Sequence, residues 1–156
     1  MRSNRGFTMV ETLVALVVLA VGMLGVASLF ALSLHSGASA ISRMQAVNLA
    51  SDMADRIRAN RRAGIAYAGT GVLADNVCVG AGAANCTPQQ LAKNDIYLWQ
   101  QLITQTFPNS AATGTIAYAS GGSLEFPSTY TISLSWAEQG QTTNSTYAAV
   151  VQAPEN

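Results

Sequence analysis

The chain has 156 residues, of which only 10% are charged, and its formal net charge is zero. This balance gives no basic field of the kind that nucleic-acid binding requires, so no nucleic-acid partner is expected. The length allows one small folded domain beside a membrane-spanning segment.

An uncharged run covers residues 12–42, and its most apolar part is the segment 13–34. As a helix this segment is about 33 Å long, against about 30 Å for the hydrocarbon core of a bilayer. Glu11 lies just before the apolar segment, where a lone carboxylate costs up to about 3 kcal/mol at a membrane centre and less near the interface. The run therefore predicts a membrane-spanning helix that begins with an unusual acidic residue.

The residues before the run carry a specific pattern. From its start the chain has a short basic leader, then Gly6-Phe7-Thr, two further residues and Glu11, and after these the apolar helix. This pattern resembles the signal of type IV prepilins and of the pseudopilins of type II secretion. The resemblance implies that a prepilin peptidase cleaves between Gly6 and Phe7 and N-methylates Phe7, and that Glu11 acts in subunit assembly.

Two further stretches extend the resemblance. Residues 13–16 with 21–25, and residues 52–60, are similar to the corresponding parts of PilV-type minor pilins. That similarity implies a minor pilin needed for assembly or initiation of the type IV pilus and incorporated through its N-terminal helix. The implied partners are other minor and major pilins, the prepilin peptidase, the inner membrane and a pilus tip adhesin. A minor, I-like pseudopilin of a type II secretion system is the alternative.

Three other interpretations fit less well. A cleaved secretory signal has a shorter apolar core and a small-residue exit site, which is missing here. An ordinary single-span anchor fits the length but not the Gly-Phe-Thr pattern. A membrane-anchored binding module that never polymerises would not explain the presence of Glu11 or of the Gly6-Phe7 site.

The expected organisation has three parts: a leader at 1–6, a transmembrane and polymerisation helix at 7–35, and a periplasmic globular domain at 36–156. Arg2 and Arg5 place the N-terminus in the cytoplasm by the positive-inside rule. Arg43 counts against that orientation, which therefore rests partly on the family resemblance. The chain is expected in the inner membrane and then in the pilus, with its tip as one location.

No proline precedes Pro88, so one helix can extend from Thr8 past Arg58. Its second half has apolar residues at helical spacing, which predicts one face packed on the globular domain. That face comprises Val47, Ala50, Met53, Ala54 and Ile57. Arg56 with Asp52 and Arg58 with Asp55 have the spacing of helical ion pairs. Gly64 is the expected helix end.

Residues 65–85 show little periodicity and predict an irregular connection that ends near two cysteines. Cys78 and Cys86 suit an oxidising periplasm, where a disulfide closing this small ring is worth about 2.5 kcal/mol in the entropic model. A metal site is the rival interpretation, but two cysteines without a nearby histidine supply too few ligands.

The rest of the chain predicts one helix and then a sheet. Thr87, Pro88 and Gln90 form a helix start with a capping box, and the helix should continue to about Thr106. Its expected core face is a wide stripe of Leu91, Leu98 and Leu102 with Ile96, Trp99 and Ile103 beside it. Asp95 and Trp99 are one turn apart, a spacing that permits an indole-to-carboxylate hydrogen bond.

Period-two patterns predict strands at 115–118, 130–136 and 147–151, with a weaker run at 124–126. The expected fold is α+β: the type IV pilin fold, with a long N-terminal helix packed on a small antiparallel sheet of three or four strands and one additional helix.

No pattern of catalytic residues is found. The single histidine, His35, lies at the outer end of the apolar helix without a catalytic neighbour in sequence. No carboxylate pair, nucleophile motif or metal-ligand spacing occurs elsewhere. The sequence therefore predicts neither an enzyme nor a cofactor or metal site.

Overall fold

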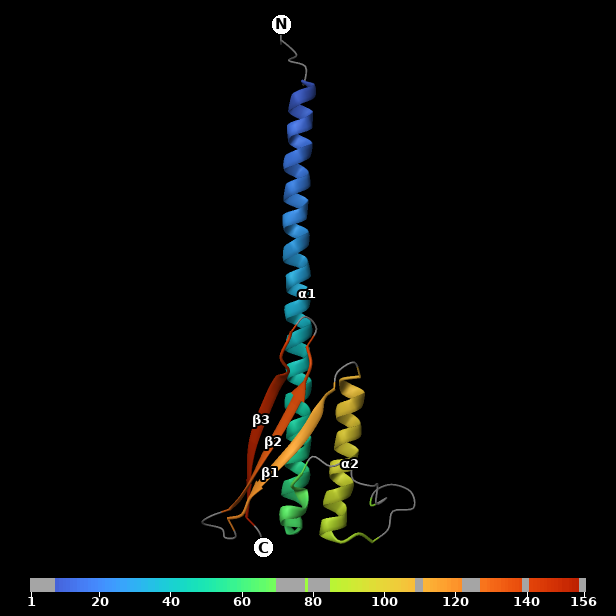
Figure 1. Cartoon of the computed structure of the whole chain (residues 1–156), viewed down its shortest axis with the longest axis vertical. Helices are drawn as coiled ribbons and strands as arrows, with labels where there is room; N and C mark the ends of the chain where they lie inside the picture. The colour runs from blue at the N-terminus through green and yellow to red at the C-terminus, as the bar shows by residue number, and fades with distance from the viewer. Residues whose placement is uncertain are drawn as a thin grey trace. The chain divides into compact units, whose positions relative to one another are not determined.

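The first element is α1, Met9–Ala59, a helix of 51 residues (Figure 1). The computed structural model describes residues 8–69, 78, 85–108, 111–121, 127–138 and 141–154. The chain divides into two units, Met1–Ile41 and Ser42–Asn156, and α1 contributes residues to both. The long N-terminal helix expected from the sequence is confirmed.

The predicted end of this helix was wrong. α1 ends at Ala59, and the 3-10 helix η1, Arg61–Tyr67, follows. Gly64 lies inside η1 with a φ of 51°, a left-handed conformation that glycine adopts without a steric penalty. Just after this end, the side chain of Asn60 donates a hydrogen bond to the carbonyl oxygen of Pro88 at 2.8 Å.

Helix α2, Pro88–Thr106, begins as predicted. The Gln90 amide donates to the Thr87 hydroxyl at 3.2 Å, and the Thr87 amide donates to the Gln90 side chain at 2.9 Å. This reciprocal pair satisfies amides that the first turn of a helix leaves without partners. The expected core face is only partly correct, because Leu102 is 38% exposed whereas Ile96, Trp99 and Ile103 are fully buried.

The sheet has three antiparallel strands in the order β1-β2-β3: β1 Thr113–Ala119, β2 Ser128–Trp136 and β3 Ser145–Ala153. Every second residue of β2 is buried, as its alternating sequence predicts. The weaker run at 124–126 lies outside the described residues. The α+β class and the antiparallel meander expected from the sequence are confirmed.

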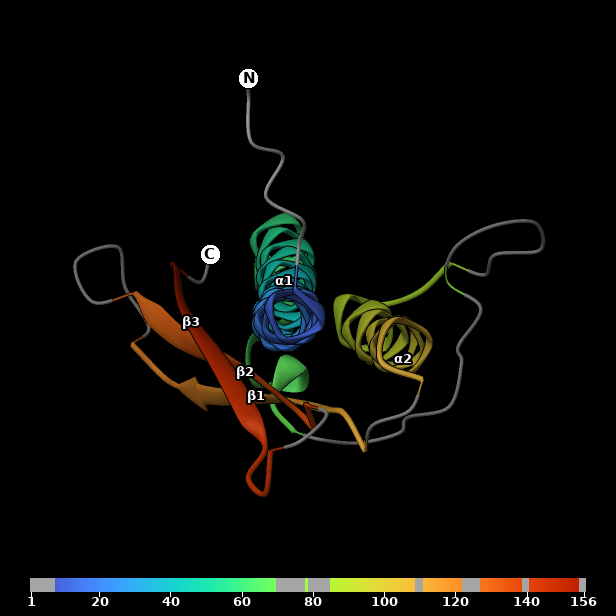
Figure 2. The same ribbon diagram turned by 90° about the horizontal axis from the view of Figure 1, so that it is seen from above.

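One hydrophobic core joins the sheet, α2 and the second half of α1, which lie over the same face of the sheet (Figure 2). The α1 face was predicted with one error: Ala46 is buried, whereas Val47 is 37% exposed. The other buried members of this face are Ala50, Met53, Ala54 and Ile57.

Gly114 on β1 allows α2 to approach the sheet closely. A Cβ atom at this position would lie 2.6 Å from Cδ1 of Ile103 and would also overlap the ring of Trp99. The carbonyl oxygen of Gly114 accepts a hydrogen bond from the Gln100 side chain at 2.6 Å. A side chain larger than hydrogen at this position therefore has no room.

Candidate functional site

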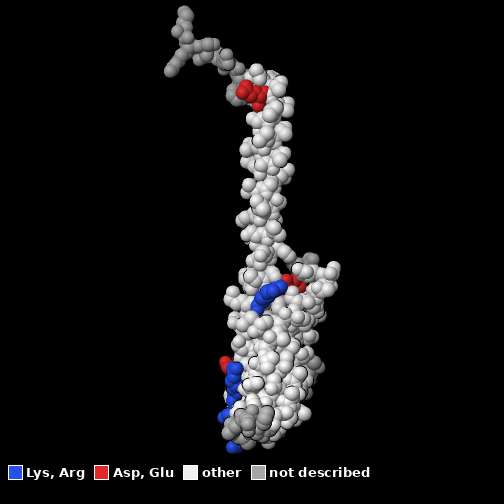
Figure 3. Space-filling view, turned by 90° about the vertical axis from the view of Figure 1, so that its left-hand side faces the viewer, with Lys and Arg blue, Asp and Glu red and all other residues white. Residues whose placement is uncertain are grey.

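The first part of α1, residues 9–41, has a surface made almost entirely of exposed apolar side chains. The helix is long and apolar enough to cross a membrane, by length and composition. On the face that Figure 3 shows, this part of the helix carries no charged group beyond the acidic group near its start. A stable water-exposed helix would carry polar residues on one face, so this surface requires either lipid or another protein around it.

Glu11 lies in the first turn of α1. Its amide donates to the carbonyl oxygen of Thr8 at 3.1 Å and to the Thr8 hydroxyl at 3.3 Å, so Thr8 caps the helix. A carboxylate in the first turn is stabilised by the positive end of the helix dipole. Gly6 and Phe7 lie outside the described residues, and their proposed cleavage and methylation stay predictions.

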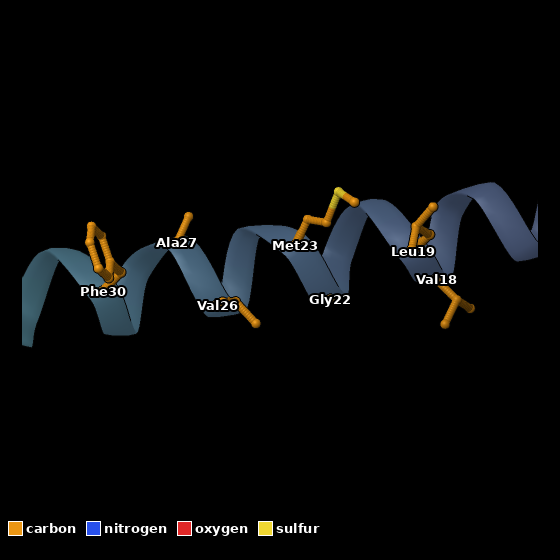
Figure 4. Close-up of a pocket in the computed structure, with 7 residues that line it drawn as sticks. All are labelled: Val18, Leu19, Gly22, Met23, Val26, Ala27 and Phe30. Atoms are coloured by element: carbon orange, nitrogen blue, oxygen red, sulfur yellow. The ribbon is translucent and has the colours of Figure 1, made fainter.

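A shallow apolar depression lies along this helix (Figure 4). It is lined by Val18, Leu19, Gly22, Met23, Val26, Ala27 and Phe30. Within the described part of the chain, no atom lies within 4 Å of a Cβ built at Gly22, Gly25 or Gly37, apart from the neighbouring residues of the helix itself. The chain's own fold therefore gives no packing reason for these glycines.

A polar junction in the second unit joins α1, η1 and α2. The Arg56 guanidinium lies 2.9 Å from Asp52 and 3.2 Å from Asp95. The Tyr67 hydroxyl donates to the other Asp95 oxygen at 2.7 Å and accepts from the Asn60 amide at 3.3 Å. We call Arg56, Asp95, Tyr67 and Asn60 the polar junction.

Burial shapes the ionisation of the junction. Burial, with a hydrogen bond to Asp95, raises the pKa of Tyr67 well above its ordinary value of 10.0, so the phenol stays protonated. Burial lowers the pKa of Arg56, but the hydrogen bonds and charges of Asp52 and Asp95 outweigh that effect and raise it overall. The junction is therefore a neutral phenol and a paired guanidinium around one carboxylate.

This geometry differs from the expected Asp95–Trp99 pair. The Trp99 indole donates instead to the carbonyl oxygen of Leu49 on α1, at 2.9 Å. Asp95 instead faces Arg56 and Tyr67. The sequence did not predict the contact with Tyr67, because that residue lies in a segment without a periodic pattern. The expected helical ion pairs Arg56 with Asp52 and Arg58 with Asp55 are both present.

Cys78 and Cys86 form a disulfide bond with a Cα–Cα distance of 5.7 Å. The Cys78 amide donates to the side-chain oxygen of Asn94 at 3.4 Å, and Asn94 is fully buried on α2. The bond thus fastens the connection to the start of α2. Among the described residues, no group of three or more His, Cys, Asp and Glu side chains is placed to hold a metal ion.

Two family models match the chain. Residues 1–27 match the prokaryotic N-terminal methylation motif, and residues 28–97 match the Tt1218-like family, described as type IV pilin Tt1218. No curated protein and no solved structure matches the chain. Type IV pilins are structural proteins rather than enzymes, they assemble with other pilins, and the methylation motif is processed by a prepilin peptidase. The two matches lie in consecutive segments that together cover residues 1–97, and the chain has the long helix, small antiparallel sheet and additional helix of the type IV pilin fold.

Proposed function

We propose that the chain is a minor pilin of the type IV pilus, of the PilV type, which acts in pilus assembly or its initiation. The observation that carries this proposal is the exposed apolar helix of residues 9–41 with a single charge, Glu11, in its first turn. Such a helix is suited first to a membrane and then to the packed centre of a filament. The similarity of residues 13–16, 21–25 and 52–60 to PilV-type pilins supports the finer assignment.

The proposed organisation follows from the same helix. Residues 1–6 are a cytoplasmic leader, residues 7–35 span the inner membrane, and residues 36–156 form the periplasmic domain. After processing and assembly the chain becomes part of the pilus, where the tip and its adhesin are the proposed neighbours of a minor subunit. Cys78 and Cys86 lie in the proposed periplasmic domain, an oxidising compartment that preserves a disulfide.

Glu11 has a specific part in this proposal. Cleavage before Phe7 creates a new amine close to the Glu11 carboxylate of a neighbouring, staggered subunit. Two charges that are each costly in an apolar environment then neutralise each other. Because only one axial offset brings the two groups together, the pair also fixes the register between subunits.

The glycines of the helix support close packing between subunits. Glycine in a helix interior costs about 1 kcal/mol relative to alanine, and within the described part of the chain a Cβ added at Gly22 or Gly25 would meet no atom within 4 Å beyond the helix itself. In membranes and other apolar surroundings, small residues let helices approach each other closely. A neighbouring pilin helix in the depression around Gly22 would use that space.

The proposal is tested by the Glu11→Ala variant. It should insert into the membrane and mature normally, but its amount in sheared pili should fall about tenfold or more relative to the membrane fraction, because a buried amine is left unpaired. Asp55→Ala is the matched control, since Asp55 forms only an exposed ion pair with Arg58. Equal incorporation of wild type and Glu11→Ala would contradict the proposed role. Recovery of the wild type with type II secretion components instead of pili would assign it to the pseudopilins.

A further inference from the structure

The sheet has an open edge at β3. Figure 1 shows β3 at the side of the sheet away from α2, and among the described strands it pairs with β2 alone. Within the described part of the chain, no backbone group of β3 is hydrogen-bonded outside that ladder. Since paired residues of an antiparallel ladder alternate, every second residue of β3 presents its N–H and C=O outward.

This edge lacks the usual protection against pairing. Proteins shield edge strands with lysine, proline, bulges, short length or a covering segment. β3 has nine residues, contains no charged residue and no proline, and pairs with β2 without interruption from Ser145 to Ala153. By contrast, the outer edge of β1 is covered at one point, where Gly69 and Ile116 exchange two hydrogen bonds of 2.9 and 3.1 Å.

The core beneath the start of β3 is also incompletely covered. The inward-facing residues of β2 are all buried. On β3, only Val151 and Ala153 reach that degree of burial, whereas Tyr147 and Ala149 stay half-exposed although they face the same side. An additional strand beside β3 would place its own inward-facing side chains next to these two residues and exclude water from them.

We infer that the edge of β3 binds an extended, uncharged segment of a neighbouring pilus protein, which adds to the sheet as a fourth strand. The inference rests on the proposed function, because it places the partner in the pilus. Main-chain hydrogen bonds supply the affinity in strand addition, and alternate side chains supply the specificity. A partner strand with apolar residues at every second position matches the uncharged edge and the half-exposed Tyr147 and Ala149.

A second copy of the chain fits this edge less well. Two β3 strands paired around a twofold axis are antiparallel, so the α1 residues 42–59 of the two copies would point in opposite directions. Subunits anchored in one membrane share a single direction. The occupant is therefore a different segment, presented by another protein of the same filament.

Proline substitution separates the two sides of β3. Ala148 pairs with Ser133 and Ala149 with Ile132, so one of the two amides points toward β2 and the other points outward. Of Ala148→Pro and Ala149→Pro, the variant with the outward amide should keep the wild-type melting temperature. The same variant should lose about fivefold or more of its incorporation into sheared pili.

A lysine pair provides a test that leaves every backbone hydrogen bond in place. Val150, which is 65% exposed, and Ala117 lie on the same rung of the sheet at opposite edges, each paired with Thr131. Val150→Lys should lower incorporation into pili, whereas Ala117→Lys should not, because only one of the two edges receives the partner strand.

The outcomes separate this inference from the proposed function. Normal incorporation of the wild type, of Val150→Lys and of a stable proline variant would overturn the inference alone. A full-length chain in detergent that sediments as a dimer, and as a monomer after Val150→Lys, would also overturn it by making a second copy the occupant. A wild-type chain absent from pili would overturn the proposed function and this inference with it.

Discussion

The two units of the chain differ in whether their apolar side chains are exposed or buried. In residues 9–41 the apolar side chains are exposed, and this stretch forms no ion pair with any other described residue. In the unit Ser42–Asn156, by contrast, the large aromatic side chains Trp99, Trp136, Tyr67 and Tyr130 are fully buried. The second unit is stabilised by contacts within the chain. The first unit depends on surroundings that the chain itself does not provide, and this dependence is what makes it suited to assembly.

The same contrast applies to the acidic residues. Asp95 is surrounded by Arg56 and Tyr67 of its own chain, while Glu11 has a hydrogen-bonded amide but no cation beside its carboxylate among the described residues. Removing Asp95 should therefore damage folding, and removing Glu11 should damage only assembly.

The largest expected effect is that of Asp95→Ala. It leaves the Arg56 guanidinium without one of its partners, and the buried Tyr67 hydroxyl keeps only the more distant carbonyl oxygen of Arg56, at 3.2 Å, as an acceptor. The loss in free energy of unfolding should be about 3 kcal/mol, at the lower end for a broken buried pair because the Arg56 side chain is 27% exposed. Denaturation of the full chain in detergent, followed by the fluorescence of the buried Trp99 and Trp136, measures it.

Glu11→Ala serves as the comparison in the same assay. Its free energy of unfolding should equal that of the wild type within error. A loss similar to that of Asp95→Ala would mean that Glu11 has a partner inside the chain, and the contrast between the two units would fail.

A glycine pair gives the next largest effect. Gly114→Ala should destabilise the second unit by about 1–3 kcal/mol, because the added methyl group meets the rigid ring of Trp99 and the side chain of Ile103. The same change at Gly22, where the described chain leaves open space, should not lower the stability of the isolated chain. The same denaturation measurement decides both, and a loss at Gly22 would reveal a contact of that residue within the chain.

The sequence predicted the parts of the fold that depend on neighbours along the chain. Thr87 and Gln90 predict the start of α2, and the alternation of apolar and polar residues from Tyr130 to Trp136 predicts a half-buried strand. Both signals are local, because capping and strand pleating act within a few residues. The prokaryotic N-terminal methylation motif likewise matches residues 1–27, where the prepilin pattern was found.

What the sequence missed depends on long-range packing. Periodicity shows that α2 has an apolar stripe but not which part of a wide stripe meets the sheet, so Leu102 was placed in the core although it is 38% exposed. The contact of Asp95 with Tyr67 spans 28 residues and joins a regular helix to a segment with no pattern. The one available signal was the position of Asp95 one turn from Trp99, and it suggested the wrong partner, because the Trp99 indole donates to the carbonyl oxygen of Leu49.

The smallest expected effect is a pH dependence of the second unit. The folded state raises the pKa of Tyr67 above 10.0, so its contribution to stability is complete below pH 10 and is lost as the pH rises toward the folded-state value. Above pH 10 this residue should lower the free energy of unfolding by up to about 1.4 kcal/mol per pH unit. Denaturation of the wild type and Tyr67→Phe at pH 8 to 11 measures this component, which the variant should lack. Equal slopes would show that the phenol is not buried as described.

The identity of the mature N-terminus tests the central claim most directly, because the assembly role requires the chain to be processed as a prepilin. Mass spectrometry of the chain purified from its native membrane should find residues 1–6 removed and a methylated Phe7 at the new N-terminus. An intact Met1, or cleavage beyond the apolar helix, would contradict the account, since neither product provides a new amine beside Glu11 at the start of an intact assembly helix.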